Sequence, residues 1–215
     1  MYYTWRTDSE GRIWRRLGDG PEECPTLSAA GISLCEKGIA RWSDSFRAWG
    51  MGVRWEWLIA MAYQESGFDP RARNKEGTED PDNDGIGLFQ ITYPSLKGRK
   101  LLAQLDGSKK WVGGYTDEQL MDPQLNTTIA CRHILGLIRQ YGMDFPKVSA
   151  AFNAGSVRKP GTPAHENPWG MHMTQSHVES EVRCLNYVIT RGVPTERDVA
   201  PHFGRLELLS EDDLG

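Results

Sequence analysis

An apolar run that ends on a carboxylate constrains this chain more than any other feature of its sequence. The run has large apolar side chains at helical spacing: Trp55, Leu58, Ile59, Met61, Ala62 and Tyr63. Glu65 follows on the same face, and Phe68-Asp69-Pro70 ends the helix. A carboxyl in that place is at least half removed from water, which raises its pKa and lets it hold a proton near neutral pH. The alternative is an ordinary glutamate at a helix end, facing water.

Apolar spacing elsewhere predicts a mainly α fold with a small N-terminal β-hairpin. A first helix is expected at 34–49, after a cap at Ser28 or Ser33. Further helices are expected around Leu120 and at 126–141, 147–153 and 178–189. The first 20 residues predict the hairpin, because aromatic residues flank the turn Asp8-Ser9-Glu10-Gly11. The segment Gly85 to Thr92 predicts a buried turn. The predicted organisation is a hairpin at 1–27, a catalytic domain at 28–195 and a tail at 196–215.

Composition narrows the possible partners and cofactors. A chain of 215 residues with 39% hydrophobic residues suits one compact domain. The net charge of -4 gives no basic field, so nucleic acid is not expected as a partner. Four scattered cysteines form no zinc pattern and indicate mostly buried thiols, with one bridge left open. No cofactor and no membrane insertion are predicted, and the oligomeric state is left open.

Five short blocks occur in an order that resembles one known family. They are Glu65-Ser66-Gly67-Phe68-Asp69-Pro70, Gly87-Leu88-Phe89-Gln90, Asp122-Pro123-Gln124-Leu125-Asn126, Ala151-Phe152-Asn153-Ala154-Gly155 and the late helical Tyr187. Together they resemble the lytic transglycosylases and goose-type lysozymes, over roughly residues 38–192. Each block is weak alone, and their common order carries the resemblance.

The resemblance implies a fold, a substrate and a set of roles. The fold would be a lysozyme-like helical domain with a substrate cleft. The substrate would be the glycan strands of bacterial peptidoglycan, cut between MurNAc and GlcNAc. Glu65 would protonate the leaving oxygen and then take a proton from the MurNAc 6-hydroxyl, closing a 1,6-anhydro ring. Residues implied to bind or orient the substrate are Asn74, Gly87, Phe89, Gln90, Asn153 and Tyr187. Phe89 and Phe152 replace the methionine and tyrosine of the family pattern, and Asn74 replaces its serine.

An acidic stretch, Asp80-Pro81-Asp82-Asn83-Asp84-Gly85, leaves three interpretations open. It can be a plain solvated loop, which we favour. Asp82 or Asp84 can be a second catalytic carboxylate, which would make the enzyme an inverting goose-type muramidase that activates water. The stretch also resembles the start of a calcium-binding loop, but Ile91 stands where that loop requires a glutamate, so no metal is expected.

Two alternatives concern the whole chain. One is a catalytically inactive module that binds the cell wall or has a structural role. The other concerns the route to the wall: the N-terminus lacks the apolar run of a secretory signal, which predicts synthesis in the cytosol and release by lysis or injection, as for a phage endolysin or virion enzyme.

Overall fold

The computed structural model describes residues 3–74, 84–92, 100–103, 109–112, 115–154 and 172–191. It is mainly helical, as predicted. The helices are α1 (Ala29–Trp49), α2 (Trp55–Ser66), α3 (Asp117–Leu120), α4 (Pro123–Tyr141), α5 (Phe145–Ala154) and α6 (His172–Thr190). Within the described ranges, none of these helices has the length and apolarity required to cross a bilayer.

Local sequence signals explain where the helices begin. The Ser28 side chain accepts a hydrogen bond from the Gly31 amide at 3.2 Å, so Ser28 rather than Ser33 caps α1. Thr116 and Gln119 form a reciprocal capping box at α3. Asp122 accepts from the Leu125 amide at 2.8 Å, and a proline follows at the first position of α4.

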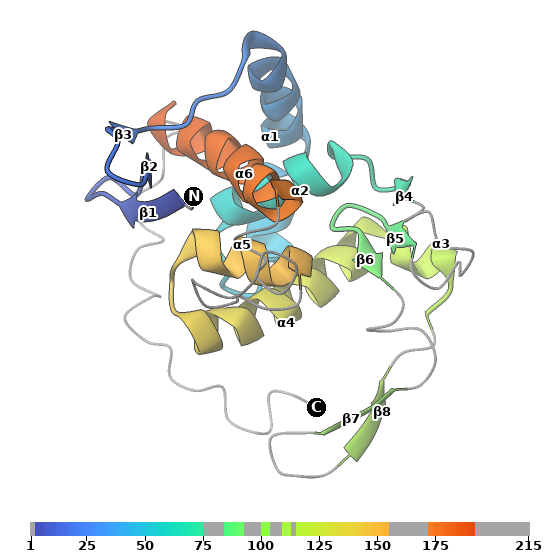
Figure 1. Cartoon of the computed structure of the whole chain (residues 1–215). Coiled ribbons are helices and arrows are strands. Elements are labelled where there is room, and N and C mark those ends of the chain that lie inside the picture. Colours follow the sequence, from blue (N-terminus) through green and yellow to red (C-terminus); the bar gives the residue numbers. More distant parts are fainter. Residues whose placement is uncertain are drawn as a thin grey trace.

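Helix α2 is the central helix of the fold. It packs against both α1 and α6, and Figure 1 shows these two helices on either side of it. Leu58 through Ala62 are fully buried, which explains why this segment is apolar on all faces rather than along one stripe. Gly67, in the left-handed conformation at φ 59°, ends the helix directly after Glu65 and Ser66.

Three small antiparallel sheets surround the helices. The first contains β1 (Tyr3–Thr7), β2 (Ile13–Leu17) and β3 (Glu22–Glu23), and confirms the predicted hairpin. The second contains β4 (Arg73–Asn74), β5 (Gly85–Ile86) and β6 (Ile91–Thr92). The third, β7 (Lys100–Ala103) with β8 (Lys109–Val112), was not predicted, because its segment is polar and glycine-rich.

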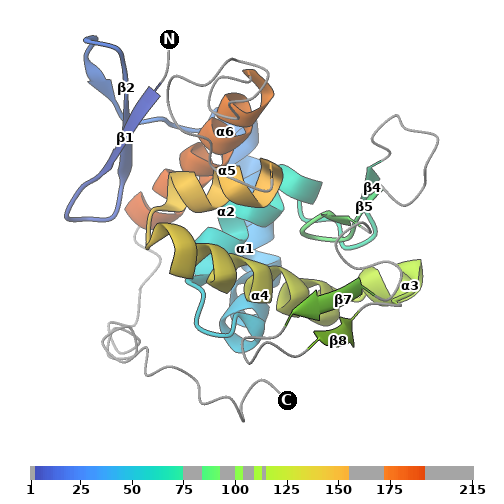
Figure 2. The ribbon, with the colours of Figure 1, turned by 60° about the horizontal axis from the view of Figure 1, so that its bottom comes forward.

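The N-terminal hairpin is joined to the last helix by buried contacts, and Figure 2 shows it standing beside α6. Ile13 is 1% exposed and belongs to the core. The Asn186 side chain accepts from the Ile13 amide at 2.7 Å and donates to the Ile13 carbonyl at 2.9 Å. These paired bonds satisfy the backbone N–H and carbonyl of a buried residue at the start of β2.

The segment Gly85 to Thr92 forms the predicted buried turn, and Asn126 of α4 holds it. The Asn126 side chain donates to the carbonyls of Ile86 and Leu120, each at 2.8 Å, and accepts from the Phe89 amide at 2.9 Å. Asn126 is fully buried. A single side chain therefore satisfies three backbone groups that have no water available.

Candidate active site

Glu65 lies in the last turn of α2, beside the turn formed by residues 87–90. Its side chain is 12% exposed, so most of the carboxyl is removed from solvent while part of it stays accessible. The next residue, Ser66, donates a hydrogen bond to the Leu88 carbonyl at 2.9 Å. The end of α2 is thus fixed to the buried turn, which fixes the backbone from which Glu65 extends.

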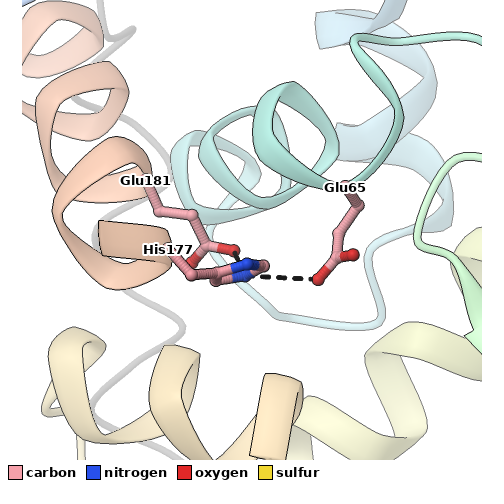
Figure 3. Close-up of side chains that lie close together, drawn as sticks. All are labelled: Glu65, His177 and Glu181. Atoms are coloured by element: carbon pink, nitrogen blue, oxygen red, sulfur yellow. Dashed lines mark hydrogen bonds and ion pairs between the residues drawn. The ribbon is translucent and has the colours of Figure 1, made fainter. Parts of the chain in front are cut away.

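Two side chains of α6 complete a cluster with Glu65, as Figure 3 shows. The His177 Nε2 atom lies 3.4 Å from Glu65 Oε1 and 3.0 Å from Glu181 Oε1. His177 and Glu181 are one helical turn apart, on the same face of α6. One ring nitrogen therefore faces two carboxylates, one from each of the two helices that pack together.

Glu181 is the most enclosed member of this cluster. Its side chain is fully buried, and among the described residues its Oε2 atom has no hydrogen-bond partner. A buried carboxylate is costly unless it is paired, and here the pairing group is His177. Asn153 of α5 contacts the other ring nitrogen, with its amide 3.3 Å from His177 Nδ1. When the ring is protonated, Nδ1 donates, and the Asn153 amide accepts through its oxygen.

The environment changes the proton affinity of two members of the cluster. Burial raises the pKa of Glu65, and the neighbouring His177 offsets only part of that rise. Burial alone lowers the pKa of His177, but the charge and hydrogen bond of Glu181, helped by Glu65, outweigh it and raise that pKa to about 10. The His177 ring is therefore protonated at neutral pH, and the raised pKa of Glu65 favours the protonated form of its carboxyl.

Gly87, Phe89 and Gln90, the predicted binding residues of the turn at 87–90, lie in different environments. A side chain at Gly87 (φ 80°) would come within 2.4 Å of the Asn126 Nδ2 atom, so packing within the fold already requires glycine there. Phe89 is fully buried and packs against Phe46, so it lies in the core and forms no wall of a sugar site. Gln90 is half-buried, and its Nε2 atom donates to the carbonyls of Gly87 and Ala72. Substrate contacts of Gly87 and Gln90 stay predictions.

Of the other predicted binding residues, the structure brings one to Glu65. Asn153 lies on His177 and so next to the cluster. Asn74 is exposed in β4, and its contact with sugar stays a prediction. Tyr187 is not beside Glu65: its hydroxyl donates to Glu36 of α1. It follows His177 on α6 by about 15 Å along the helix axis.

The Tyr187 contact gives a testable expectation. Tyr187→Phe should lower the free energy of unfolding by about 1 kcal/mol, because it removes one hydrogen bond that joins α6 to α1. Turnover of the folded protein should be unchanged. Thermal melting and initial rates on purified cell walls measure the two quantities. A fall in turnover at unchanged stability would instead place the hydroxyl at the reaction.

Of the two aspartates predicted as a second carboxylate, only Asp84 lies among the described residues. Asp84 is 4% exposed, and the Arg73 Nε atom donates to it at 2.7 Å. Arg73 also pairs with Asp117 at 2.8 Å. The Arg73 guanidinium therefore lies between two carboxylates and compensates part of their negative charge. Asp82 and the predicted tail at 196–215 lie outside the described residues.

Glu65, His177 and Glu181 are the one group of three potential metal-binding side chains among the described residues, with ligand atoms within 4.8 Å of one another. His177 Nε2 lies at hydrogen-bond distance from Glu181 and at ion-pair distance from Glu65. The imidazole therefore links the two carboxylates of the group.

His177 and Glu181 were not identified as site residues from the sequence. A signal was available: Glu181 lies between Val178 and Val182 on an apolar face, as Glu65 lies among the apolar residues of α2. A histidine one turn before such a glutamate is a candidate for its partner. The contact with Glu65 carries no local signal, because it joins distant parts of the chain.

A family model described as the transglycosylase SLT domain matches residues 45–163. The chain belongs to this family. The matched range of the SLT domain includes Glu65, the buried turn and Asn153, whereas His177 and Glu181 follow it.

Similar proteins carry related names. The membrane-bound lytic murein transglycosylase F of Shewanella sediminis (strain HAW-EB3) is 32% identical over 76 residues, 35% of this chain and 14% of that protein. The same-named protein of Vibrio campbellii (strain ATCC BAA-1116) is 26% identical over 83 residues, 39% of this chain and 14% of its own length. The match thus spans a small part of the length of these relatives.

Proposed function

We propose that this chain cleaves the MurNAc-β-1,4-GlcNAc bond of bacterial peptidoglycan as a lytic transglycosylase and leaves 1,6-anhydro-MurNAc ends. The observation that carries the proposal is the placement of Glu65, a largely buried carboxyl with a raised pKa at the partly accessible end of α2. Membership in the SLT domain family and the names of the relatives support the substrate.

The chemistry requires a proton on Glu65 at the start. A protonated carboxyl delivers that proton to the glycosidic oxygen as the bond to MurNAc breaks, and the leaving GlcNAc departs as an alcohol. The carboxylate that results then takes the proton of the MurNAc 6-hydroxyl, whose oxygen bonds to the anomeric carbon. Glu65 ends the cycle protonated, and no water is consumed.

A hydrolytic mechanism is the second candidate, and it needs a further carboxylate. Asp84 is poorly suited to hold an attacking water, because Arg73 occupies it and the side chain is nearly buried. Glu181 lies close to Glu65, but it is fully buried behind His177 and so cannot reach a sugar. These two placements favour a mechanism with one carboxylate.

Product analysis tests the proposal. Mass spectrometry of the fragments released from purified peptidoglycan should find mainly anhydro ends, one water lighter than the ends that hydrolysis leaves. Mainly reducing MurNAc ends would favour the hydrolase, and Asp82→Asn would then be expected to lose activity. An inactive wall-binding module would sediment with the wall and release nothing.

Asp84→Asn tests the hydrolytic mechanism at Asp84, the aspartate of the two that lies among the described residues. It should reduce thermal stability, because the Arg73 contact loses its charge. Its products should stay anhydro and its rate per folded molecule should stay near that of the unmodified protein. A severe loss of rate in a fully folded Asp84→Asn would return Asp84 to the reaction.

A further inference from the structure

A cationic group beside a catalytic acid is unfavourable unless something balances it. A protonated imidazole 3.4 Å from Glu65 favours the ionised form of that carboxyl, and a general acid must start the reaction protonated. Glu181 resolves this conflict, because its carboxylate binds the same ring nitrogen at 3.0 Å. The His177–Glu181 pair has no net charge and still turns its positive end toward Glu65.

The geometry points to His177 and Glu181 as positioning residues for Glu65: their buried ion pair holds one oxygen of Glu65 in place, leaves that carboxyl protonated before reaction, and stabilises the charge that develops on it during proton transfer. The inference rests on the proposed function. It adds two residues that lie beyond the matched range of the family.

Burial supports a dedicated pair rather than an incidental contact. Glu181 is fully buried, and in the described part of the chain His177 is its one hydrogen-bond partner. Removing this carboxylate from water costs free energy. Charged groups that are buried in this way cluster at functional sites. The His177 side chain is 11% exposed, so the pair and Glu65 share one poorly hydrated region in which their charges interact strongly.

The groups that face the cluster come from the helices that pack around it. Helix α2 provides Glu65, and α5 provides the uncharged amide of Asn153. On α6 the thiol of Cys184 lies near Glu181, and burial raises its pKa, so it stays neutral. Its neighbour across the core is Cys35 of α1, with the two sulfur atoms 3.2 Å apart. Within the described ranges, the charges that act on Glu65 are therefore those of His177 and Glu181.

The proposal predicts opposite effects of two substitutions on the alkaline limb of the pH–rate profile, which reports loss of the proton from Glu65. Glu181→Gln should move this limb to lower pH, because His177 then pairs with Glu65 alone and favours its ionised form. His177→Gln should move it to higher pH, because the cation is gone. His177→Gln should also lower the maximal rate by about tenfold or more, since a preorganised positive charge is lost from the transition state.

The experiment measures initial rates on purified peptidoglycan from pH 4 to 9, with chelator present so that a bound metal cannot shift the profile. Glu179→Gln is the matched control. Glu179 lies on the same helix but pairs with Arg15 and Arg183, so its removal should leave the limb in place. A limb that moves in the same direction for both test variants, or in neither, overturns the proposal.

A second measurement does not depend on activity. In NMR titrations the His177 ring of the unmodified protein should stay protonated through pH 8, because Glu181 and Glu65 raise its pKa to about 10. In Glu181→Gln it should lose its proton at a lower pH. An unshifted His177 titration in Glu181→Gln counts against the pair.

The double variant His177→Gln/Glu181→Gln covers the case in which Glu181→Gln fails to fold, because it leaves no unpaired buried charge. Its limb should move upward as in His177→Gln, since the effect of His177 on Glu65 exceeds that of Glu181. A double variant with an unmoved limb overturns the proposal.

Glu65→Gln separates the proposed function from the proposed role of the pair. If Glu65→Gln stays active, the proposed function fails. An inactive Glu65→Gln with unmoved limbs in the other variants rejects the role of the pair alone.

Discussion

Replacing Glu65 by glutamine should lower turnover by about 10²- to 10⁴-fold, the usual contribution of general acid–base catalysis. The amide has the shape of the protonated carboxyl and can still contact His177, but it has no proton to give to the glycosidic oxygen. Because one group serves as acid and then as base, neither step has a substitute among the described residues.

The melting temperature of Glu65→Gln should stay within a few degrees of the unmodified protein, because the amide has nearly the size and shape of the carboxyl that it replaces. Glu118→Gln, on the exposed face of α3, is the control and should retain full activity. Release of soluble fragments from purified walls gives the rate. Activity of Glu65→Gln within tenfold of the unmodified protein would remove Glu65 from its assigned role.

The second large effect concerns stability. Asn126→Ala should lower the free energy of unfolding by about 3–5 kcal/mol, because three buried backbone groups lose their partner and each costs about 1–3 kcal/mol when unsatisfied. Natural domains are stable by only about 5–15 kcal/mol, so much of the protein would be unfolded at physiological temperature.

Denaturant unfolding of Asn126→Ala measures this loss. Gln124→Ala is the control, since the Gln124 side chain is exposed on the same helix. The Thr128 hydroxyl donates to the backbone carbonyl of Gln124, which alanine keeps. A change below about 1 kcal/mol for Asn126→Ala would mean that water replaces the lost hydrogen bonds in the turn.

The helices could be predicted from sequence because their signals are local. Each signal acts within a few residues, as do the cap at Ser28, the proline after Asp122 and the apolar run of α2. Glu65 could be predicted for the same reason, since its own helix places it among apolar neighbours. The sheet of β7 and β8 could not, because its polar segment lacks the alternation that identifies a strand.

Tertiary contacts decided the predictions that differ from the structure. Phe89 belongs to a block that resembles a substrate-binding motif, but packing against Phe46 places it in the core. Tyr187 matches a family position, but its direction on α6 brings it to Glu36. His177 was not predicted as a site residue, because nothing near it in the sequence reveals Glu65 as its neighbour.

The bond between Ile13 and Asn186 connects residues 173 positions apart, and the helix that makes it also carries His177. During synthesis the ribosome releases α6 after every other described element, so the hairpin waits for its partner until nearly the whole chain has emerged. The same docking event brings the imidazole to Glu65. A nascent or prematurely ended chain that lacks α6 thus has Glu65 without the pair beside it, and we expect the proposed activity to reach its full rate only once the last helix has docked.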